Sequence, residues 1–197
     1  MDAKPFSQAS ENNKHATLAV LKELFADRKK VLEIGSGTGQ HACFFAEHLP
    51  QLHWQPSDMI ENLPGVRQWR CDAGLSNLLE EKPFDVRRDG LPAADSDAVF
   101  SANTLHIMAW PEVQTTFRHL AALSTDTKLC IYGPFNYAGE FTSESNARFN
   151  DWLLQRNSGS AIRDFEAVNE LADDAGFTFG FDYTMPANNR LLYWQKR

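Results

Sequence analysis

The sequence has few cysteines and no long hydrophobic run, and these two shortages exclude several classes of protein. Its three cysteines, Cys43, Cys71 and Cys130, are an odd number without a Cys-x-x-Cys spacing, which argues against a disulfide framework and against a zinc site. We therefore expect reduced thiols, a cytoplasmic protein and no bound metal. No apolar run approaches the roughly 20 residues that span a bilayer, and no apolar signal-peptide core follows Met1.

Basic charge is also in short supply. The chain carries 19 Lys and Arg against 26 Asp and Glu, a formal net charge of −7 at pH 7. Surfaces that bind nucleic acid are normally basic, so a nucleic-acid partner is not favoured. With 43% hydrophobic residues, a chain of 197 residues has the composition of a globular protein and the length of one domain. We expect a single soluble domain over residues 1–197.

One stretch near the N-terminus joins a short apolar run, three alternating glycines and a helical pattern. Residues 31–34 are typical of a strand buried on both faces, and apolar residues recur at helical spacing over 41–49. Between them, Gly35, Gly37 and Gly39 permit positive φ and close approach of a ligand to the backbone. Strand, glycine turn and helix form the first unit of a nucleotide-binding α/β sheet. A tight turn without a ligand is the plainer alternative.

An acidic residue follows at the position where such sheets hold a sugar. Asp58 comes about twenty residues after the glycine loop, just past a predicted strand over residues 52–55. Because a carboxylate accepts hydrogen bonds from both hydroxyls of a cis-diol, Asp58 is a candidate ribose ligand. Met59 is a candidate contact for the base. In the alternative interpretation, Asp58 is a turn residue after Pro56 and Ser57.

A second informative block follows a predicted buried strand over residues 98–101. Asn103 and His106 come just beyond its carboxyl end, the edge at which open α/β sheets bind ligands. His106, with an ordinary pKa near 6.5, is a candidate general base or acceptor contact. It is equally a candidate cap for the next helix, which starts near Trp110. That tryptophan is a candidate pocket wall or a core residue.

The remaining elements follow from apolar spacing and turn residues. We predict a first helix capped by Ser10 or Asn13, with apolar positions up to Phe25. The later elements are a helical piece near 75–79, the end of a strand at 83–86, a helix over 112–123, a strand from 128, a helix starting within 142–146, a helix capped by Asp164, and strands over 177–184 and 190–195.

The loop from Glu33 to Gly39 differs from the Gly-x-Gly-x-x-Gly spacing of dinucleotide folds. It resembles the first motif of the class I S-adenosylmethionine (SAM)-dependent methyltransferases. Within that class, nearly the whole chain is similar to a small methyltransferase-like family long known as a domain of unknown function. The similarity rests on residues 11–14, 55–58, 103–107, 132–135, 143–146, 162–164 and 185–189.

The resemblance implies a Rossmann-like α/β fold with helices on both faces of a seven-stranded, mostly parallel sheet. The implied strand order is 3-2-1-4-5-7-6, with the last strand antiparallel. It also implies SAM as the cofactor and transfer of its methyl group to a small-molecule acceptor. The implied cofactor-binding residues are Glu33, Gly35, Ser36, Gly37, Gly39, Asp58, Met59, Asp85, Val86 and Asn103.

His106 and Asn103 are the candidate catalytic residues, with Asn103 close to the sulfonium. The candidate acceptor pocket consists of Trp110, Tyr132, Asn146, Arg163 and Asn189. Arg163 suggests a carboxylate or phosphate on the acceptor, unless it forms a structural pair with Asp164. Residues 1–14 are either a lid over the cofactor or a capping segment with a solvated tail.

Other functions stay open at this point. The chain could bind SAM without transferring methyl groups, or it could methylate protein or RNA. A docking face for a macromolecule would normally be long or basic, which the net charge of −7 disfavours. A nicotinamide-dependent enzyme is a further alternative, because that class also uses a glycine loop after the first strand.

Overall fold

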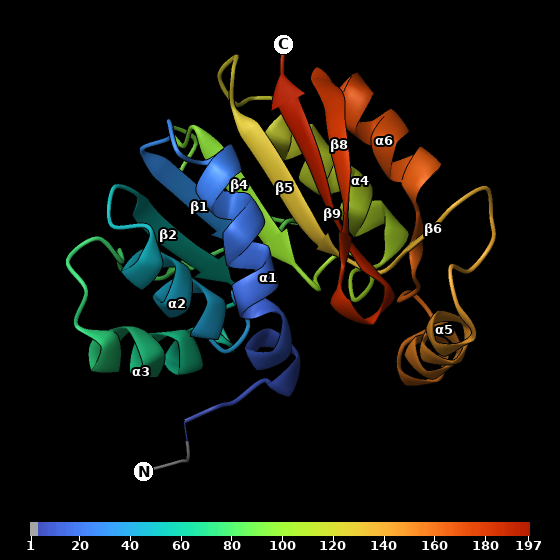
Figure 1. The fold of residues 1–197 in the computed structure, drawn as a ribbon, viewed down its shortest axis with the longest axis horizontal. Coiled ribbons are helices and arrows are strands. Elements are labelled where there is room, and N and C mark those ends of the chain that lie inside the picture. The colour runs from blue at the N-terminus through green and yellow to red at the C-terminus, as the bar shows by residue number, and fades with distance from the viewer. Residues whose placement is uncertain (1–3) are drawn as a thin grey trace.

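In the computed structural model, which describes residues 4–197, seven strands form one sheet with helices on both faces (Figure 1). The strands are β1 (Lys30–Ile34), β2 (His53–Asp58), β3 (Lys82–Pro83), β4 (Ala98–Ala102), β5 (Lys128–Gly133), β8 (Phe177–Met185) and β9 (Asn189–Lys196). The helices are α1 (Gln8–Leu24), α2 (Gln40–His48), α3 (Leu63–Ala73), α4 (Trp110–Leu120), α5 (Glu144–Arg156), α6 (Phe165–Asp174) and the 3₁₀ turn η1 (Pro186–Asn188).

The strand order is β3-β2-β1-β4-β5-β9-β8, and β9 runs antiparallel to both of its neighbours. Two short strands, β6 (Phe135–Asn136) and β7 (Arg163–Asp164), pair only with each other. With these two set aside, β8 and β9 are the sixth and seventh strands of the sheet. The expected order 3-2-1-4-5-7-6 with an antiparallel last strand is therefore confirmed.

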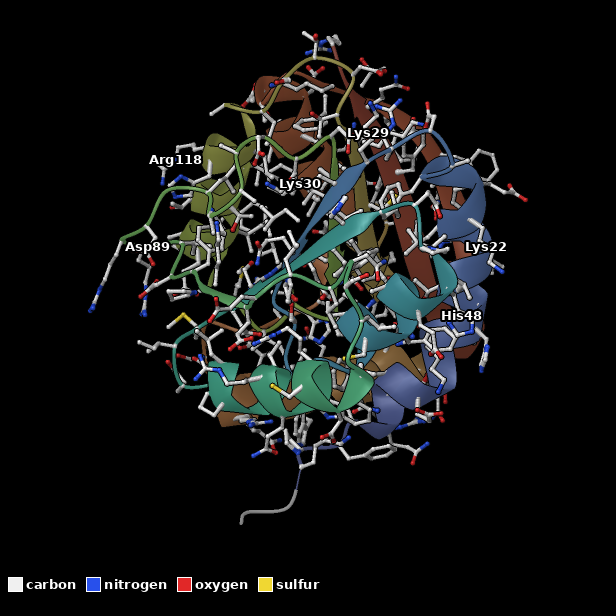
Figure 2. All side chains as sticks on the ribbon, turned by 90° about the vertical axis from the view of Figure 1, so that its left-hand side faces the viewer. Lys22, Lys29, Lys30, His48, Asp89 and Arg118 are labelled. Carbon is white, nitrogen blue, oxygen red and sulfur yellow. The ribbon has the colours of Figure 1, made fainter. Side chains whose placement is uncertain are left out.

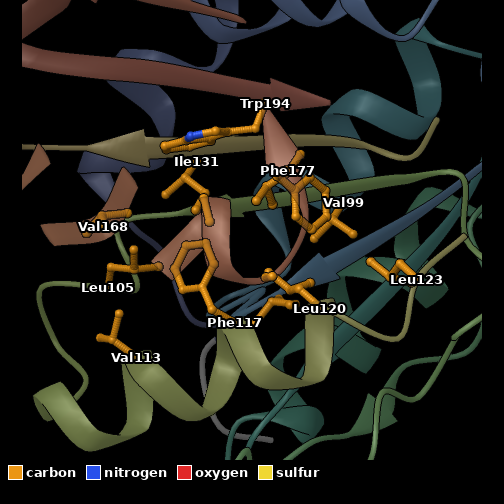
Figure 3. Close-up of a cluster of buried hydrophobic side chains, with 14 of the residues drawn as sticks. Val99, Leu105, Val113, Phe117, Leu120, Leu123, Ile131, Val168, Phe177 and Trp194 are labelled. Carbon is orange, nitrogen blue, oxygen red and sulfur yellow. The ribbon is translucent and has the colours of Figure 1, made fainter. Parts of the chain in front are cut away.

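Two hydrophobic clusters hold the helices on the sheet. On one face, α4 and α6 pack through a cluster that includes Val113, Phe117, Val168 and Trp194 (Figure 3). On the other face, α1 and α2 pack through a cluster that includes Phe45. Both clusters draw on β1, β4 and β5, which is why these central strands read as continuous apolar runs in the sequence.

Charged side chains lie outside these layers. Lys22, Asp89 and Arg118 project from the periphery of the molecule (Figure 2). Among the described residues, no helix combines the length and the hydropathy needed to cross a membrane. One helix, α5, lies beyond the carboxyl ends of the parallel strands rather than on a face of the sheet (Figure 1).

Several predicted elements differ from the structure, among them the third strand, which spans Lys82–Pro83 and does not extend over 84–86. α1 is capped by Ser7, whose side chain accepts from the Ser10 backbone N–H, and not by Ser10 or Asn13. The helix after β2 spans Leu63–Ala73 rather than 75–79; only two of its residues are fully buried, so its apolar signal is weak.

The second strand, predicted to end at Gln55, continues to Asp58 through Pro56. The Trp54 backbone N–H donates to the Asn77 carbonyl, on the edge of the strand that faces away from β1. Pro56 comes two residues later, so its nitrogen, which carries no hydrogen, faces the same edge. β3 begins to pair only at Ser57, and no neighbouring strand therefore needs that donor.

Candidate functional site

A pocket of about 1020 Å³ opens at the carboxyl ends of β1, β2, β4 and β5. It lies over the point between β1 and β4 where the strand order reverses, which is where open α/β sheets bind ligands. Of the residues predicted for the site, those that line it are Gly35, Ser36, Gly37, Asp58, Met59, Asp85, Val86, Asn103, His106, Asn146 and Asn189.

The three glycines of the loop have different physical roles. All have positive φ. A β carbon on Gly35 would meet Thr104 Oγ1 at 2.4 Å, and one on Gly39 would meet Val66 Cα at 2.9 Å, so these two glycines allow the loop to pack closely. Gly37 has no atom within 4 Å of its β-carbon position. Gly37 is exposed and lines the pocket, so we expect a side chain there to reduce the space open to a ligand.

Asp58 links the end of β2 to the glycine loop. One carboxylate oxygen accepts from the Gly37 backbone N–H at 2.6 Å. The other accepts from the Met59 backbone N–H and from Asn62 Nδ2, both at 2.7 Å. Burial raises the pKa of Asp58, while these three donors oppose that rise. The carboxylate is fixed at the pocket wall, and Oδ2, which accepts from Gly37 alone, has room for one further donor.

Apolar and charged groups alternate along the wall beside β3. Met59, Phe84 and Val86 give this wall an apolar surface suited to a flat base. The Asp85 carboxylate is held by Arg87, with Nε and Nη2 both at 2.8 Å from its oxygens. The hydrogen bonds from Arg87 lower the pKa of Asp85 to about 2, so it is ionised and ready to accept an additional donor.

Asn103 and His106 lie on the opposite side of the reversal point. Asn103 has φ of +56°, a conformation that asparagine tolerates better than most residues. His106 is 6% exposed and lines the pocket, and its ring contacts Phe149 edge to face at 5.4 Å between centroids. Burial and the nearby Arg163 charge lower the pKa of His106 to about 4, so its ring is neutral at pH 7. The value near 6.5 expected from the sequence is wrong because the ring is desolvated.

Five predicted site residues do not line the pocket: Glu33, Gly39, Trp110, Tyr132 and Arg163. Glu33 lies beneath the loop and accepts from Ser36 Oγ at 2.9 Å and from Trp54 Nε1 at 3.1 Å. Burial raises the pKa of Glu33 to about 7. Trp110 packs against the hydrophobic cluster that holds α4 and α6 on the sheet. Tyr132 is buried next to the side chains of Asn13 and Asn189.

Arg163 binds backbone carbonyls instead of Asp164. Its Nε donates to Leu105 O at 3.1 Å, and its Nη2 donates to Gly159 O at 2.9 Å and to Met108 O. These bonds fasten the loop after β4 to β7. The guanidinium is committed to the fold, and it is not directed at a ligand.

The N-terminal segment forms part of the pocket rim. Ser7, Ala9 and Ser10 line the pocket. The segment is tied down by Trp69 Nε1, which donates to Pro5 O at 2.7 Å, and by a 2.6 Å ion pair between Lys4 and Asp72. The proposed lid over residues 1–14 stays a prediction, and residues 1–3 lie outside the described part of the chain.

Several lining residues were not predicted from the sequence. Asn62 comes four residues after Asp58, a spacing that offers an amide to the same carboxylate. His41, in the first turn after the glycine loop, lines the pocket with its ring bonded to Asn13 Oδ1 at 2.6 Å. Phe149, on the helix predicted to start within 142–146, lines the pocket as well.

Comparisons with known proteins identify the family and the fold of the chain. A family model described as "Protein of unknown function (DUF938)" matches residues 4–196. Among solved structures, the apo form of the SAM-dependent methyltransferase SibL has a TM-score of 0.79 at 21% identity. An O-methyltransferase family 2 protein from Planctomyces limnophilus, in complex with apigenin, has a TM-score of 0.83 at 17% identity. PigF with S-adenosylhomocysteine (SAH) has a TM-score of 0.77 at 17% identity.

These matches cover 95%, 96% and 92% of the chain but only 55%, 58% and 61% of the respective solved chains. The chain therefore spans a little over half the length of the proteins that it resembles. At this level of identity the likeness establishes the fold, which is that of the class I methyltransferases.

Proposed function

Since the chain belongs to the DUF938 family and has the class I methyltransferase fold, we propose that it transfers a methyl group from SAM to a small-molecule acceptor. The observation that carries this proposal is the open face of Gly37 beside the Asp58 carboxylate, at the strand reversal of a pocket of about 1020 Å³. The free thiols of Cys43, Cys71 and Cys130 are consistent with a cytoplasmic enzyme.

The residues of the cofactor half match the parts of SAM. In the proposal, Asp58 accepts from the ribose hydroxyls, Asp85 accepts from the adenine amino group, and Val86 and Met59 contact the ring. The backbone at Gly37 leaves room for the rest of the molecule. Glu33 supports the loop from beneath through Ser36. The donors and acceptors present therefore fit a nucleoside that carries no phosphate.

When bound, SAM supplies a methyl group made electrophilic by its sulfonium. The protein's contribution is positioning and exclusion of water. We propose that Asn103, fixed in its left-handed conformation at the end of β4, helps to position the reacting groups. His106 lines the pocket and is neutral at pH 7, and in the proposal it takes the proton that an oxygen or nitrogen nucleophile gives up as it is methylated.

Calorimetric titration tests cofactor binding. We expect wild-type protein to bind SAM and SAH, and Asp58→Ala to bind both about 10- to 100-fold more weakly, because charge-assisted hydrogen bonds of about 1.5–3 kcal/mol are lost. Asp151→Ala, an exposed acid on α5, is the control and should bind as wild type. If Asp58→Ala binds SAM and SAH as tightly as wild type, Asp58 is a turn residue and not a ribose ligand.

Methyl transfer needs a second measurement. Protein incubated with SAM and a fractionated metabolite extract should release SAH in at least one fraction. Binding of SAM without SAH release from metabolites, protein or RNA would favour a binding protein. Binding of NADH without affinity for SAM would instead indicate a nicotinamide enzyme.

A further inference from the structure

Asn146, in the first turn of α5, presents one polar atom to the pocket with its orientation fixed. The residue is 5% exposed. Its Nδ2 donates to Thr142 Oγ1 at 2.9 Å and to the Asn188 carbonyl at 3.2 Å, which uses both amide hydrogens. Within residues 4–197 nothing donates to Asn146 Oδ1, although Asn146 lines the pocket. The pocket lining therefore includes an amide oxygen that accepts no hydrogen bond from the described residues and is open to a ligand.

This half of the pocket has no charged side chain among the described residues. The lining residues of this half come from the end of β5, from α5 and its C-cap, and from the turn that leads into β9. They are Pro134, Ser145, Asn146, Phe149, Asn157, Ala187 and Asn189. The charged lining residues follow β2, β3 and β4 instead: Asp58, Glu61, Asp85, Arg87 and Glu112. Arg163, the cation nearest to His106, is committed to three backbone carbonyls.

Apolar groups also line the pocket that Asn146 borders. Phe149 lies one turn further along α5, and its ring stacks on Trp152 at 5.7 Å between centroids. Ile107 and Met108 line the pocket from the loop after β4, and Pro134 lines it from the end of β5. A ring-sized apolar body fits this surface, with one polar group directed at Asn146.

From these contacts we propose that Asn146 selects an uncharged acceptor molecule, one with a neutral O–H or N–H group donated to Asn146 Oδ1 and an apolar body packed on Phe149. This inference rests on the proposed function for the identity of the reaction. An anionic acceptor is rejected because its carboxylate would lose water without gaining a cation and would face the lone pairs of Asn146. Asn146 is thus a specificity-determining residue.

Two probes that share a phenyl ring test the proposal: phenol, which is neutral and donates, and benzoate, which is anionic and only accepts. Each is titrated into the full chain, with and without SAH, while the Asn146 side-chain amide is followed by NMR. We expect phenol to shift this resonance and to bind at least tenfold more tightly than benzoate. Asn146→Leu should weaken phenol binding about tenfold while leaving the affinity for SAH unchanged.

A second variant guards against misfolding of Asn146→Leu. Thr142→Val keeps Asn146 and removes one bond that orients it, so phenol should bind with intermediate affinity. Equal or tighter benzoate binding, unchanged phenol affinity in Asn146→Leu, or binding of neither probe would overturn the proposal. Failure of SAH to bind would contradict the proposed function instead, and the titrations without SAH would still test Asn146.

Discussion

The Asp58 carboxylate accepts the backbone N–H of Gly37 at 2.6 Å, so the end of β2 and the middle of the glycine loop hold each other in place. The protein's own hydrogen bond therefore holds the loop in shape. Such preorganisation reduces the ordering cost of binding. It also makes Gly37 and Asp58 the first positions at which the proposed cofactor site should be tested.

Gly37→Val should abolish SAM binding, because its side chain would occupy open pocket space. Gly74→Val is a matched control: Gly74 has φ of +60° against +56° for Gly37, and it too has no atom within 4 Å of its β-carbon position. Both variants should lose about 1–2 kcal/mol of unfolding free energy from left-handed strain, as measured by urea denaturation. Only Gly37→Val should lose SAM affinity by calorimetry; equal affinities in the two variants would contradict the loop assignment.

Gly35→Ala should destabilise the fold by about 2–3 kcal/mol, because the new methyl group would clash with Thr104 Oγ1 and Cγ2, at 2.4 and 2.7 Å. Thr104→Ala removes both atoms, so the double variant should recover about 1–2 kcal/mol relative to the sum of the single variants. A double-mutant cycle from chemical denaturation measures this coupling. Strict additivity would show that the two loops do not pack as described.

His106 should make the protein less stable in acid. Its pKa falls from 6.5 in the unfolded chain to about 4 in the fold, mainly through burial and secondarily through Arg163. Between these values the unfolded chain binds more protons, so the free energy of unfolding drops as the pH falls. His41, with a pKa near 4, acts in the same direction, and Glu33, with a pKa near 7, acts in the opposite one.

Comparison with a His106→Asn variant isolates the His106 contribution. From pH 7 to pH 4.5, wild type should lose about 2 kcal/mol more unfolding free energy than this variant does. Urea denaturation at both pH values gives the difference. Parallel losses in the two proteins would mean that His106 titrates normally and is not buried as neutral imidazole.

Arg163→Met should cost about 3 kcal/mol of stability, because the carbonyls of Leu105, Met108 and Gly159 lose a buried donor. Arg156→Met is the control, since Arg156 is exposed and lies 5.3 Å from the Trp152 ring; it should cost less than about 1 kcal/mol. Thermal and urea unfolding measure both. A stable Arg163→Met protein that has lost affinity for an anionic acceptor would revive the substrate-binding interpretation.

The elements that the sequence predicted well are those whose signal is local. Apolar runs placed β1, β4 and β5, and Ser143 caps α5 where the turn residues placed a cap. The strand order came from the family resemblance, because periodicity carries no information on which strands are neighbours. α3 was misplaced because it is largely solvated, with only Leu63 and Val66 buried.

The site residues also fall into those with a local sequence signal and those without one. The glycine loop, Asp58 and Asn103 follow strand ends, and strand ends meet at one edge of the sheet whatever the rest of the chain does. The direction of a long side chain depends on partners far away in the sequence. Arg163 turned to carbonyls 55 and 58 residues away, and the sequence around it offers no sign of this.

α5 lies off the faces of the sheet (Figure 1). Few hydrogen bonds join it to other segments of the protein; among them are the bond from Asn146 Nδ2 to the Asn188 carbonyl and the bond from the Ile162 backbone N–H to Asn150 Oδ1. Amino-acid changes on this helix reshape one end of the pocket while Gly37 and Asp58 keep their places on the sheet. A combinatorial library confined to residues 143–157 would therefore vary one end of the pocket without altering the glycine loop or Asp58. The same separation lets sequence changes on α5 accumulate independently of the loop at the other end.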